Sequence, residues 1–459
     1  MKGSYLVQVG LAYGAAVASL AVLNRRTSAV ANTSLINTLA NAAGDHEDIG
    51  GNASNALSAI VAQLQQAGSI TAPDSVEEAL ATLQQAVPDG PASTTDVAEA
   101  IAEAGLVPAD ILSFLNGYMD SELNSVQNTN PAPTQTIYPS KGPDDAPYSV
   151  PEQSLRAAIY IPETFGYGRN GKTPVLLVPG TAIPAGTTYH YSFSKLGDGA
   201  PVDVVWLNIP HASLSDAQVN AEYVAYAINY IAAQTNHSLA VLTWSQGALD
   251  TQWALKYWPS TRPAVQDFIA ISPDFHGTVV GTLACPALTY LICTPSLFQQ
   301  AWNATFIATL RSDGGDSAYV PTTTIFSAFD EIVQPQVGPD ASAHLGDIRG
   351  VGVTNALVQD VCAGQPAAGF YTHEGVLYNP LAWALALDAI AHDGPGSVSR
   401  VDLKRVCAQV LAPQLGLGDV LGTEGLLLVA VAELLAYQPR NTGEPAIEGY
   451  AANGSRAGR

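Results

Sequence analysis

Positive charge is scarce in this chain. Its 459 residues include 18 lysines and arginines against 40 aspartates and glutamates, for a formal net charge of −22. This balance argues against nucleic acid and against anionic membrane surfaces as partners. Charged residues of either sign make up only 13% of the chain and apolar residues 47%, so a large core is available. The sequence therefore predicts a soluble globular protein.

Cysteine and tryptophan are absent from the first 200 residues, and four cysteines and six tryptophans follow. The first 150 residues contain only four lysines and arginines but fifteen aspartates and glutamates. The spacing of the cysteines does not match that of zinc ligands, so no metal site is expected. Four cysteines allow three pairings, and the local pairing, Cys285–Cys293 with Cys362–Cys407, is the simplest.

The N-terminus has the layout of a secretory signal peptide. A positive start is followed by an apolar stretch and by Ala16-Val17-Ala18, a small-x-small cleavage site. The alternative is a membrane anchor, because residues 4–23 are almost free of strongly polar side chains. We predict a signal peptide at 1–18, a possible pro-region at 19–31 and a secreted, extracellular protein. Five N-x-S/T sequons fit a glycoprotein, at Asn32, Asn52, Asn236, Asn303 and Asn453.

Residues 32–126 are acidic and predict short amphipathic helices. One of them begins with the capping box Ser75-x-x-Glu78 and continues with an apolar stripe. This part contains no catalytic constellation and is expected to be a helical bundle or a pro-segment. Residues 127–150 are polar and rich in proline, which predicts a linker.

The pattern changes in residues 151–459, where short apolar runs alternate with helical stretches. Such runs predict a doubly wound, mostly parallel sheet that is buried on both faces, an α/β fold. The expected strands are 174–178, 202–207, 239–244, 268–271, 323–326 and 369–372. Catalytic groups on such a sheet lie at the carboxyl ends of its strands.

Ser245 lies at such an end, in Thr243-Trp-Ser-Gln-Gly247 between a predicted strand and a predicted helix. This is the context of a nucleophile elbow, although Thr243 replaces the usual glycine. The alternative role for Ser245 is an ordinary helix N-cap.

A serine nucleophile needs a base and an acid that orients the base. Asp330 and His373 follow expected strands in the order that this fold uses, serine, then acid, then histidine. His344 in a loop and His392 on a helix are weaker candidates for the base. Asp274 also follows an expected strand and is a competing candidate for the acid, with a buried or pocket carboxylate as the alternative. For Glu331 the alternative is likewise a structural role.

Acyl transfer also requires donors for the developing oxyanion. The backbone N–H of Gln246 is one candidate, and the loop Val178-Pro-Gly-Thr181 after an earlier strand supplies the other. The alternative for this loop is a simple Pro-Gly turn. All reacting groups come from the protein, so no cofactor is expected.

Five segments of the chain resemble the fungal lipase family of which Candida antarctica lipase B is the type enzyme, across about residues 140–450. They are Leu176-Val-Pro-Gly-Thr181, Val241-Leu-Thr-Trp-Ser-Gln-Gly247, Ser272-Pro-Asp-Phe-His-Gly-Thr278, Val320-Pro-Thr-Thr-Thr324 and Asp330-Glu-Ile-Val-Gln-Pro335. The resemblance implies an α/β-hydrolase fold, the triad of Ser245, Asp330 and His373, and an oxyanion hole of Thr181 and Gln246. It further implies that Trp244 and Asp274 belong to the substrate pocket.

The chain also departs from that family. Thr372 precedes His373 where the type enzyme has an aspartate, and only the Cys362–Cys407 bridge is shared. The expected function is hydrolysis of carboxylic, acylglycerol-type esters through an acyl-enzyme, with a lipid-like substrate and a transient lipid interface. The alternatives are an acyltransferase or amidase that uses the same triad, and an inactive binding protein that retains the fold.

Overall fold

The computed structural model describes residues 72–87, 94–107, 122–198, 200–280, 293–439 and 443–452. The predicted signal peptide and pro-region, Cys285, and the sequons at Asn32, Asn52 and Asn453 lie outside these residues. Within the described ranges, no helix combines the length and the apolar character needed to cross a bilayer.

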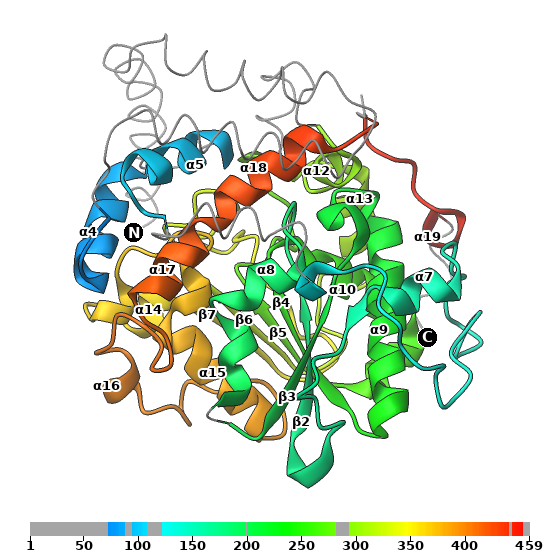
Figure 1. Ribbon diagram of the computed structural model, residues 1–459. Helices are drawn as coiled ribbons and strands as arrows, with labels where there is room; N and C mark the ends of the chain where they lie inside the picture. Colours follow the sequence, from blue (N-terminus) through cyan, green and yellow to red (C-terminus); the bar gives the residue numbers. More distant parts are fainter. Residues whose placement is uncertain are drawn as a thin grey trace.

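A seven-stranded sheet forms the centre of the structure (Figure 1). Its strands lie in the order β1-β3-β2-β4-β5-β6-β7, and every neighbouring pair is parallel except β1 with β3. The strands are β1 (Ile159–Tyr160), β2 (Thr173–Val178), β3 (Val202–Leu207), β4 (Leu239–Trp244), β5 (Val265–Ile271), β6 (Thr322–Phe326) and β7 (Val353–Leu357). This is the predicted α/β-hydrolase fold.

One predicted strand was wrong. Residues 369–372 form no strand, and the sheet instead ends on β7, which the sequence did not reveal. β7 is an edge strand with only Ala356 fully buried, so it lacks the continuous apolar run of a central parallel strand. His373 therefore follows a loop and not a strand.

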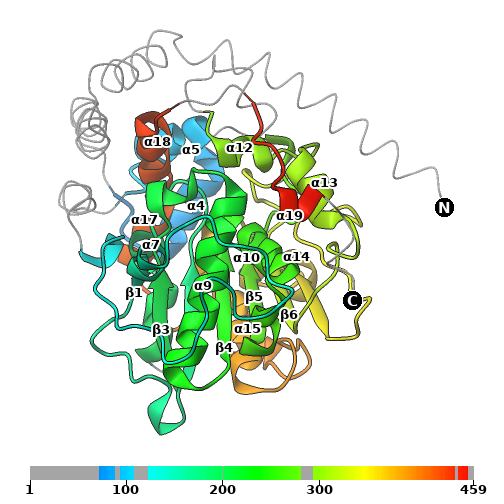
Figure 2. The ribbon, with the colours of Figure 1, turned by 90° about the vertical axis from the view of Figure 1, so that its right-hand side faces the viewer.

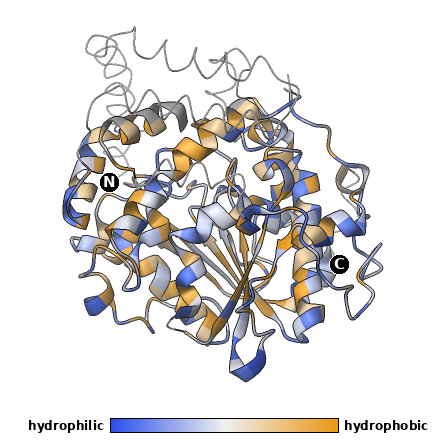
Figure 3. Ribbon diagram, in the orientation of Figure 1, coloured by the Kyte–Doolittle hydropathy of each residue, from blue (hydrophilic) through white to orange (hydrophobic). Residues whose placement is uncertain are grey.

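Helices cover both faces of the sheet, as Figures 1 and 2 show. Val175 and Leu177 of β2 pack into one core, and the alternate residues Leu176 and Val178 pack into the other. The apolar colouring of the central strands in Figure 3 follows from this double burial. The longer helices of the two layers are α9 (Ala217–Thr235), α10 (Gln246–Tyr257), α15 (Pro380–Ala391), α17 (Leu417–Glu424) and α18 (Leu426–Ala436).

Shorter helices complete the fold. They are α7 (Glu152–Ala157), α8 (Ala185–His190), α12 (Pro295–Gln299), α13 (Thr305–Arg311), α14 (Val358–Val361), α16 (Leu403–Val406) and α19 (Gly449–Ala452), with 3-10 turns η1 (Glu122–Asn124), η2 (Arg169–Gly171), η3 (Phe193–Asp198), η4 (Pro210–Ser213), η5 (Pro259–Ala264), η6 (Pro366–Ala368) and η7 (Gly375–Tyr378).

The N-terminal helices α4 (Val76–Ala86) and α5 (Thr94–Glu103) pack on the C-terminal helices. α4 begins at the predicted cap, where the Ser75 hydroxyl accepts the N–H of Glu78 at 3.1 Å. α4 contacts α17, and α5 contacts α18. Val97 and Ile101 of α5 share one buried cluster with the C-terminal helices. The N-terminal helices α4 and α5 and the C-terminal helices α17 and α18 therefore build one core.

The predicted linker, residues 127–150, lies against α9. Lys141 donates a hydrogen bond to Asn229 at 3.0 Å, and the Tyr230 hydroxyl donates one to the Pro131 carbonyl at 2.9 Å. The ring of Tyr148 stacks on Trp258 with ring centres 5.7 Å apart. Polar and aromatic contacts thus hold this segment along its length.

The predicted disulfide Cys362–Cys407 is confirmed. It joins the end of α14 to the end of α16, and the adjacent Cys407 carbonyl accepts the N–H of Ala367 at 3.0 Å. The bridge thus anchors the segment that leads to His373. Cys293 is buried, but its predicted partner Cys285 lies outside the described residues, so that pairing stays a prediction.

We expect Ile101→Ala to lower the free energy of unfolding by about 2–5 kcal/mol, because the side chain is fully buried between α5 and α18. Val126→Ala is the matched control. Val126 is 38% exposed, and its truncation is expected to change the free energy by less than about 0.5 kcal/mol. Denaturant titration of both variants measures the difference. Equal stability of the two variants would contradict the packing of α5 on the C-terminal helices.

Candidate active site

Ser245 lies at a strained turn between β4 and α10. Its backbone has φ 54° and ψ −130°, a region that costs a residue other than glycine about 1–3 kcal/mol. The Ser245 N–H donates to the Ile271 carbonyl at 3.0 Å, which ties the turn to the end of β5. The side chain is therefore held at the carboxyl edge of the sheet, as predicted.

Two glycines make room for this turn. A Cβ atom on Gly247 would lie 2.5 Å from the Pro179 carbonyl oxygen, and one on Gly180 would lie 2.9 Å from the Ser245 Cβ. The oxyanion loop and the start of α10 therefore approach each other at backbone distance. Thr243 is fully buried in β4, where a hydroxyl-bearing side chain fits in place of the usual glycine.

Asp330 and His373 are brought together. The Asp330 Oδ2 atom lies 2.7 Å from the His373 Nδ1 atom, and both side chains are almost fully buried. The Asp330 Oδ1 atom accepts the backbone N–H groups of Ile332 and Val333, at 3.0 and 2.7 Å. The carboxylate is thus fixed on one oxygen by the backbone, and its other oxygen orients the ring.

The backbone of His373 is also fixed. Its carbonyl oxygen accepts the Ser272 hydroxyl at 3.0 Å and the Trp244 indole N–H at 3.2 Å. Its N–H donates to the Glu331 Oε2 atom at 3.0 Å. Three bonds from three segments therefore replace the strand that the sequence analysis expected before this residue.

The second ring nitrogen of His373 faces the site. Its Nε2 atom is buried and has no hydrogen-bond partner among the described residues. Ser245 and His373 line the same cavity, and the Trp244 ring lies beneath with its centre 5.0 Å from the imidazole centre. The Nε2 atom is thus available to the Ser245 hydroxyl and to a reacting group. The other two candidate bases lie elsewhere: Nδ1 of His392 is bonded to Asp388 on α15, and His344 lies outside the cavity lining.

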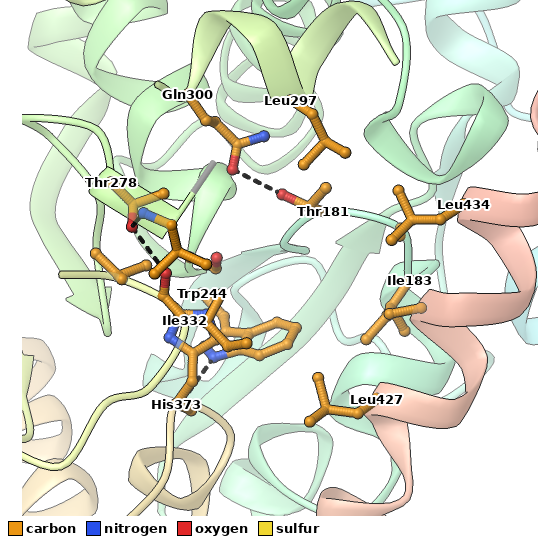
Figure 4. A pocket seen from close by; sticks show the side chains of 15 residues that line it. Thr181, Ile183, Trp244, Thr278, Leu297, Gln300, Ile332, His373, Leu427 and Leu434 are labelled. Carbon is orange, nitrogen blue, oxygen red and sulfur yellow. Dashed lines mark hydrogen bonds between the residues drawn. The ribbon is translucent and has the colours of Figure 1, made fainter. Parts of the chain in front are cut away.

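The two residues of the predicted oxyanion hole are adjacent. Thr181 lines the cavity, and its hydroxyl lies 2.8 Å from the Gln246 Oε1 atom. The same hydroxyl lies 2.9 Å from the Oε1 atom of Gln300, a residue that the sequence analysis missed (Figure 4). Gln246 is the first residue of α10, so its N–H has no partner within the helix and points out of the helix end.

The cavity has one polar end and apolar walls. Its polar lining consists of Thr181, Ser245, Thr278, Gln300 and His373. Its apolar lining consists of Ala182, Ile183, Trp244, Val280, Leu297, Ile332, Val333, Leu427, Ala430 and Leu434. Figure 4 shows Leu427 and Leu434 of α18 on one side, facing Ile332 and His373 across the opening. The α18 residues were also missed, because a helix that is apolar except for Glu433 gives no signal of what its side chains line.

Asp274 lies close to the proposed triad, and its predicted place in the substrate pocket stays a prediction. Its side chain is fully buried, it is absent from the cavity lining, and both carboxyl oxygens lack hydrogen-bond partners in the described structure. Burial raises the pKa of Asp274 to about 7, and the nearby His373 opposes this rise. The charges of His373 and Asp330 act on this carboxyl group, which therefore lies near both side chains.

Comparison with known proteins identifies the family. No family model matches the sequence. Lipase B from Pseudozyma antarctica is 33% identical to this chain over 282 residues, which are 61% of this chain and 79% of that lipase. The crystal structure of Aspergillus fumigatus lipase B matches with a TM-score of 0.83 and 61% identity, and the match covers 91% of this chain and 99% of that one.

The TM-score of 0.83 shows that this chain shares its fold with that crystal structure, and both relatives are named lipase B. The predicted resemblance is confirmed, and with it the activity class. The chain belongs to the lipase B family, and it is a carboxylic ester hydrolase with an α/β-hydrolase fold.

Proposed function

We propose that the chain is a secreted lipase that cleaves lipid-like carboxylic esters through an acyl-enzyme on Ser245. The observation that carries the proposal is the buried hydrogen bond between Asp330 and the His373 ring. The other nitrogen of that ring has no partner among the described residues, and His373 and Ser245 line the same cavity. A serine hydroxyl becomes a useful nucleophile only beside such an oriented base.

The reaction consists of two similar halves. His373 Nε2 accepts the Ser245 proton as the Oγ atom bonds to the ester carbonyl carbon, and the carbonyl oxygen becomes an oxyanion. The oxyanion collapses, the alcohol leaves with the proton from His373, and the acyl group remains on Ser245. Water then repeats the sequence with His373 again as base, which releases the acid and restores the hydroxyl.

The apolar walls support a lipid-like substrate. Leu427 and Leu434 of α18 and Ile183 of the oxyanion loop offer carbon surface across the cavity from His373. An alkyl chain therefore gains binding energy next to Ser245. Hydrolysis rates of p-nitrophenyl esters with increasing acyl length measure this preference, and product analysis with added alcohol or amine separates hydrolysis from acyl transfer.

Secretion is supported by two features of the described residues. The Cys362–Cys407 disulfide is typical of an oxidising compartment, and the sequon asparagines Asn236 and Asn303 are exposed and accessible to glycosylation. N-terminal sequencing of protein recovered from culture medium tests the signal peptide. A first residue beyond Ala18 supports cleavage, and protein retained in the membrane with Met1 intact refutes it.

We expect Ser245→Ala to lower kcat on a soluble ester by about 10⁴-fold or more, because no other group can form the acyl-enzyme. Ser140→Ala is the matched control, since Ser140 is exposed in the segment before α7 and lies outside the cavity lining. Steady-state kinetics on both variants, with circular dichroism to confirm folding, provides the measurement. Activity of Ser245→Ala close to that of the control would refute the nucleophile.

We expect Thr181→Val to lower kcat by about 10²–10³-fold with KM changed by less than about threefold. The hydroxyl binds amide oxygens in the resting state and turns to the oxygen of the substrate only as that oxygen gains charge. Thr181→Ser retains the hydroxyl and is expected to recover most of the lost rate. A raised KM with unchanged kcat would show that Thr181 is only a turn residue.

A further inference from the structure

Three buried glutamates lie directly behind the proposed base. Glu331 follows Asp330, Glu374 follows His373, and Glu424 is the last residue of α17. Their exposed fractions are 2%, 0% and 1%. No salt bridge in the described ranges reaches any of them. Three carboxylates enclosed without a cation cannot all be charged, so this carboxyl cluster must hold protons.

The contacts of the cluster connect it to His373. Glu331 Oε2 accepts the His373 N–H at 3.0 Å. Glu424 Oε1 accepts the Tyr378 hydroxyl at 2.7 Å and the Thr372 hydroxyl at 3.1 Å. Glu331 therefore holds His373 itself, and Glu424 holds Thr372, the residue before it.

The remaining oxygens of the cluster lack partners. Glu331 Oε1 and both carboxyl oxygens of Glu374 are buried and have no hydrogen-bond partner among the described residues. A charged Glu374 would leave a carboxylate with neither solvent nor donor. A protonated Glu374 carries an O–H donor, and Glu331 and Glu424 are the carboxyls whose charges act on it most strongly.

The electrostatics of the cluster agree with this geometry. Burial raises the pKa of Glu331, and the charge of Asp330 raises it further. Burial also raises the pKa of Glu374, and the charges of Glu331, Glu424 and Asp330 add to the effect. Burial raises the pKa of Glu424 to about 7, although the hydrogen bonds from Tyr378 and Thr372 oppose the rise. The titratable groups that face one another in the cluster are thus carboxyls and the Tyr378 hydroxyl. His373 is bound to the cluster through its backbone.

We propose that Glu331 is a positioning residue for His373 and that Glu374 and Glu424 keep it in place by sharing protons with it. While the cluster keeps its protons, the His373 N–H is held and the ring stays aligned with Asp330. When the cluster gains a second negative charge, repulsion among the carboxylates separates Glu331 from the His373 loop. This inference rests on the proposed role of His373 as the base.

The direction of the pH dependence follows from the raised pKa values. A carboxyl with a raised pKa in the folded protein contributes its full stability below its unfolded pKa of about 4.3. That contribution is lost as the pH rises through the folded pKa, which is about 7 for Glu424. The wild-type enzyme is therefore expected to lose thermal stability between about pH 4 and about pH 7 through Glu424, and further at higher pH through Glu331 and Glu374, whose pKa values are raised well above the ordinary value. The loss of kcat is expected at the higher pH, where the cluster gains its second charge.

Glutamine replacements test the cluster because they retain the shape and carry no charge at any pH. We expect Glu374→Gln and Glu424→Gln to move the alkaline midpoints of kcat and of thermal unfolding upward by about one pH unit or more. KM is expected to stay constant, because the affected group acts in the transition state. Profiles measured on a soluble ester from about pH 5 to about pH 10 cover the range.

Asp267→Asn is the matched control. Burial raises the pKa of Asp267 to about 8, and this carboxyl lies near the start of β5, whereas Ile271 at the end of β5 contacts Ser245. The control is expected to change the pH dependence of unfolding and to leave the alkaline midpoint of kcat at its wild-type position. A shift of that midpoint as large as in the glutamine variants would overturn the proposal.

Unchanged kcat profiles in folded Glu374→Gln and Glu424→Gln enzymes would also overturn the proposal. If Glu374→Gln does not fold, Glu424→Gln decides, since its amide oxygen still accepts from Tyr378 and Thr372.

A wild-type protein as stable at about pH 9 as at about pH 5 would refute the cluster without any variant. Ser245→Ala is expected to show the wild-type unfolding profile, so failure of the cluster and failure of the proposed reaction are separate outcomes.

Discussion

The hydrogen bond between Asp330 and the His373 ring is the interaction on which the rest of the site depends. Asp330 comes from the loop after β6, and two backbone N–H groups hold its second oxygen. His373 comes from a loop with no strand of its own, so its position depends on Ser272, Trp244 and Glu331. These three residues follow β5, end β4 and follow β6, respectively, and the parallel sheet brings their segments to one edge.

The proposed oxyanion hole is held by a different network. The Thr181 hydroxyl has one proton and two amide oxygens within hydrogen-bond distance, those of Gln246 and Gln300. Gln300 in turn donates from its Nε2 atom to the Gln246 oxygen at 2.8 Å. The proton of Thr181 is therefore shared before the reaction, and only an acceptor with strong negative charge competes for it. This arrangement favours the transition state over the bound ester.

Much of the fold and the proposed triad could be predicted from the sequence. Central parallel strands are continuous apolar runs, and the turn at Ser245 has a recognisable local pattern. β7 was missed because an edge strand is half exposed, and the loop before His373 was mistaken for a strand because it is apolar. The exact place of Asp274 could not be predicted, because its distance along the chain from β5 does not reveal the direction of its side chain.

Other parts of the site could not be predicted, because they form only when distant segments meet. Glu424 lies 51 positions after His373, and nothing in α17 marks it as a neighbour of Glu331 or Glu374. The apolar helix α18 serves two partners, the cavity on one side and α5 on the other. The acidic N-terminal segment therefore contributes to the core that supports the cavity wall, a role that its composition did not indicate.

The central claim is a covalent acyl group on Ser245, and mass spectrometry of the trapped intermediate tests it most directly. The enzyme is mixed with an activated ester, quenched in acid within one turnover and digested. The account predicts that the peptide with Ser245 gains the mass of the acyl group, and that the Asp330→Asn variant gains it far more slowly. An unmodified Ser245 peptide during rapid turnover, or an acyl group on another residue, would contradict the account.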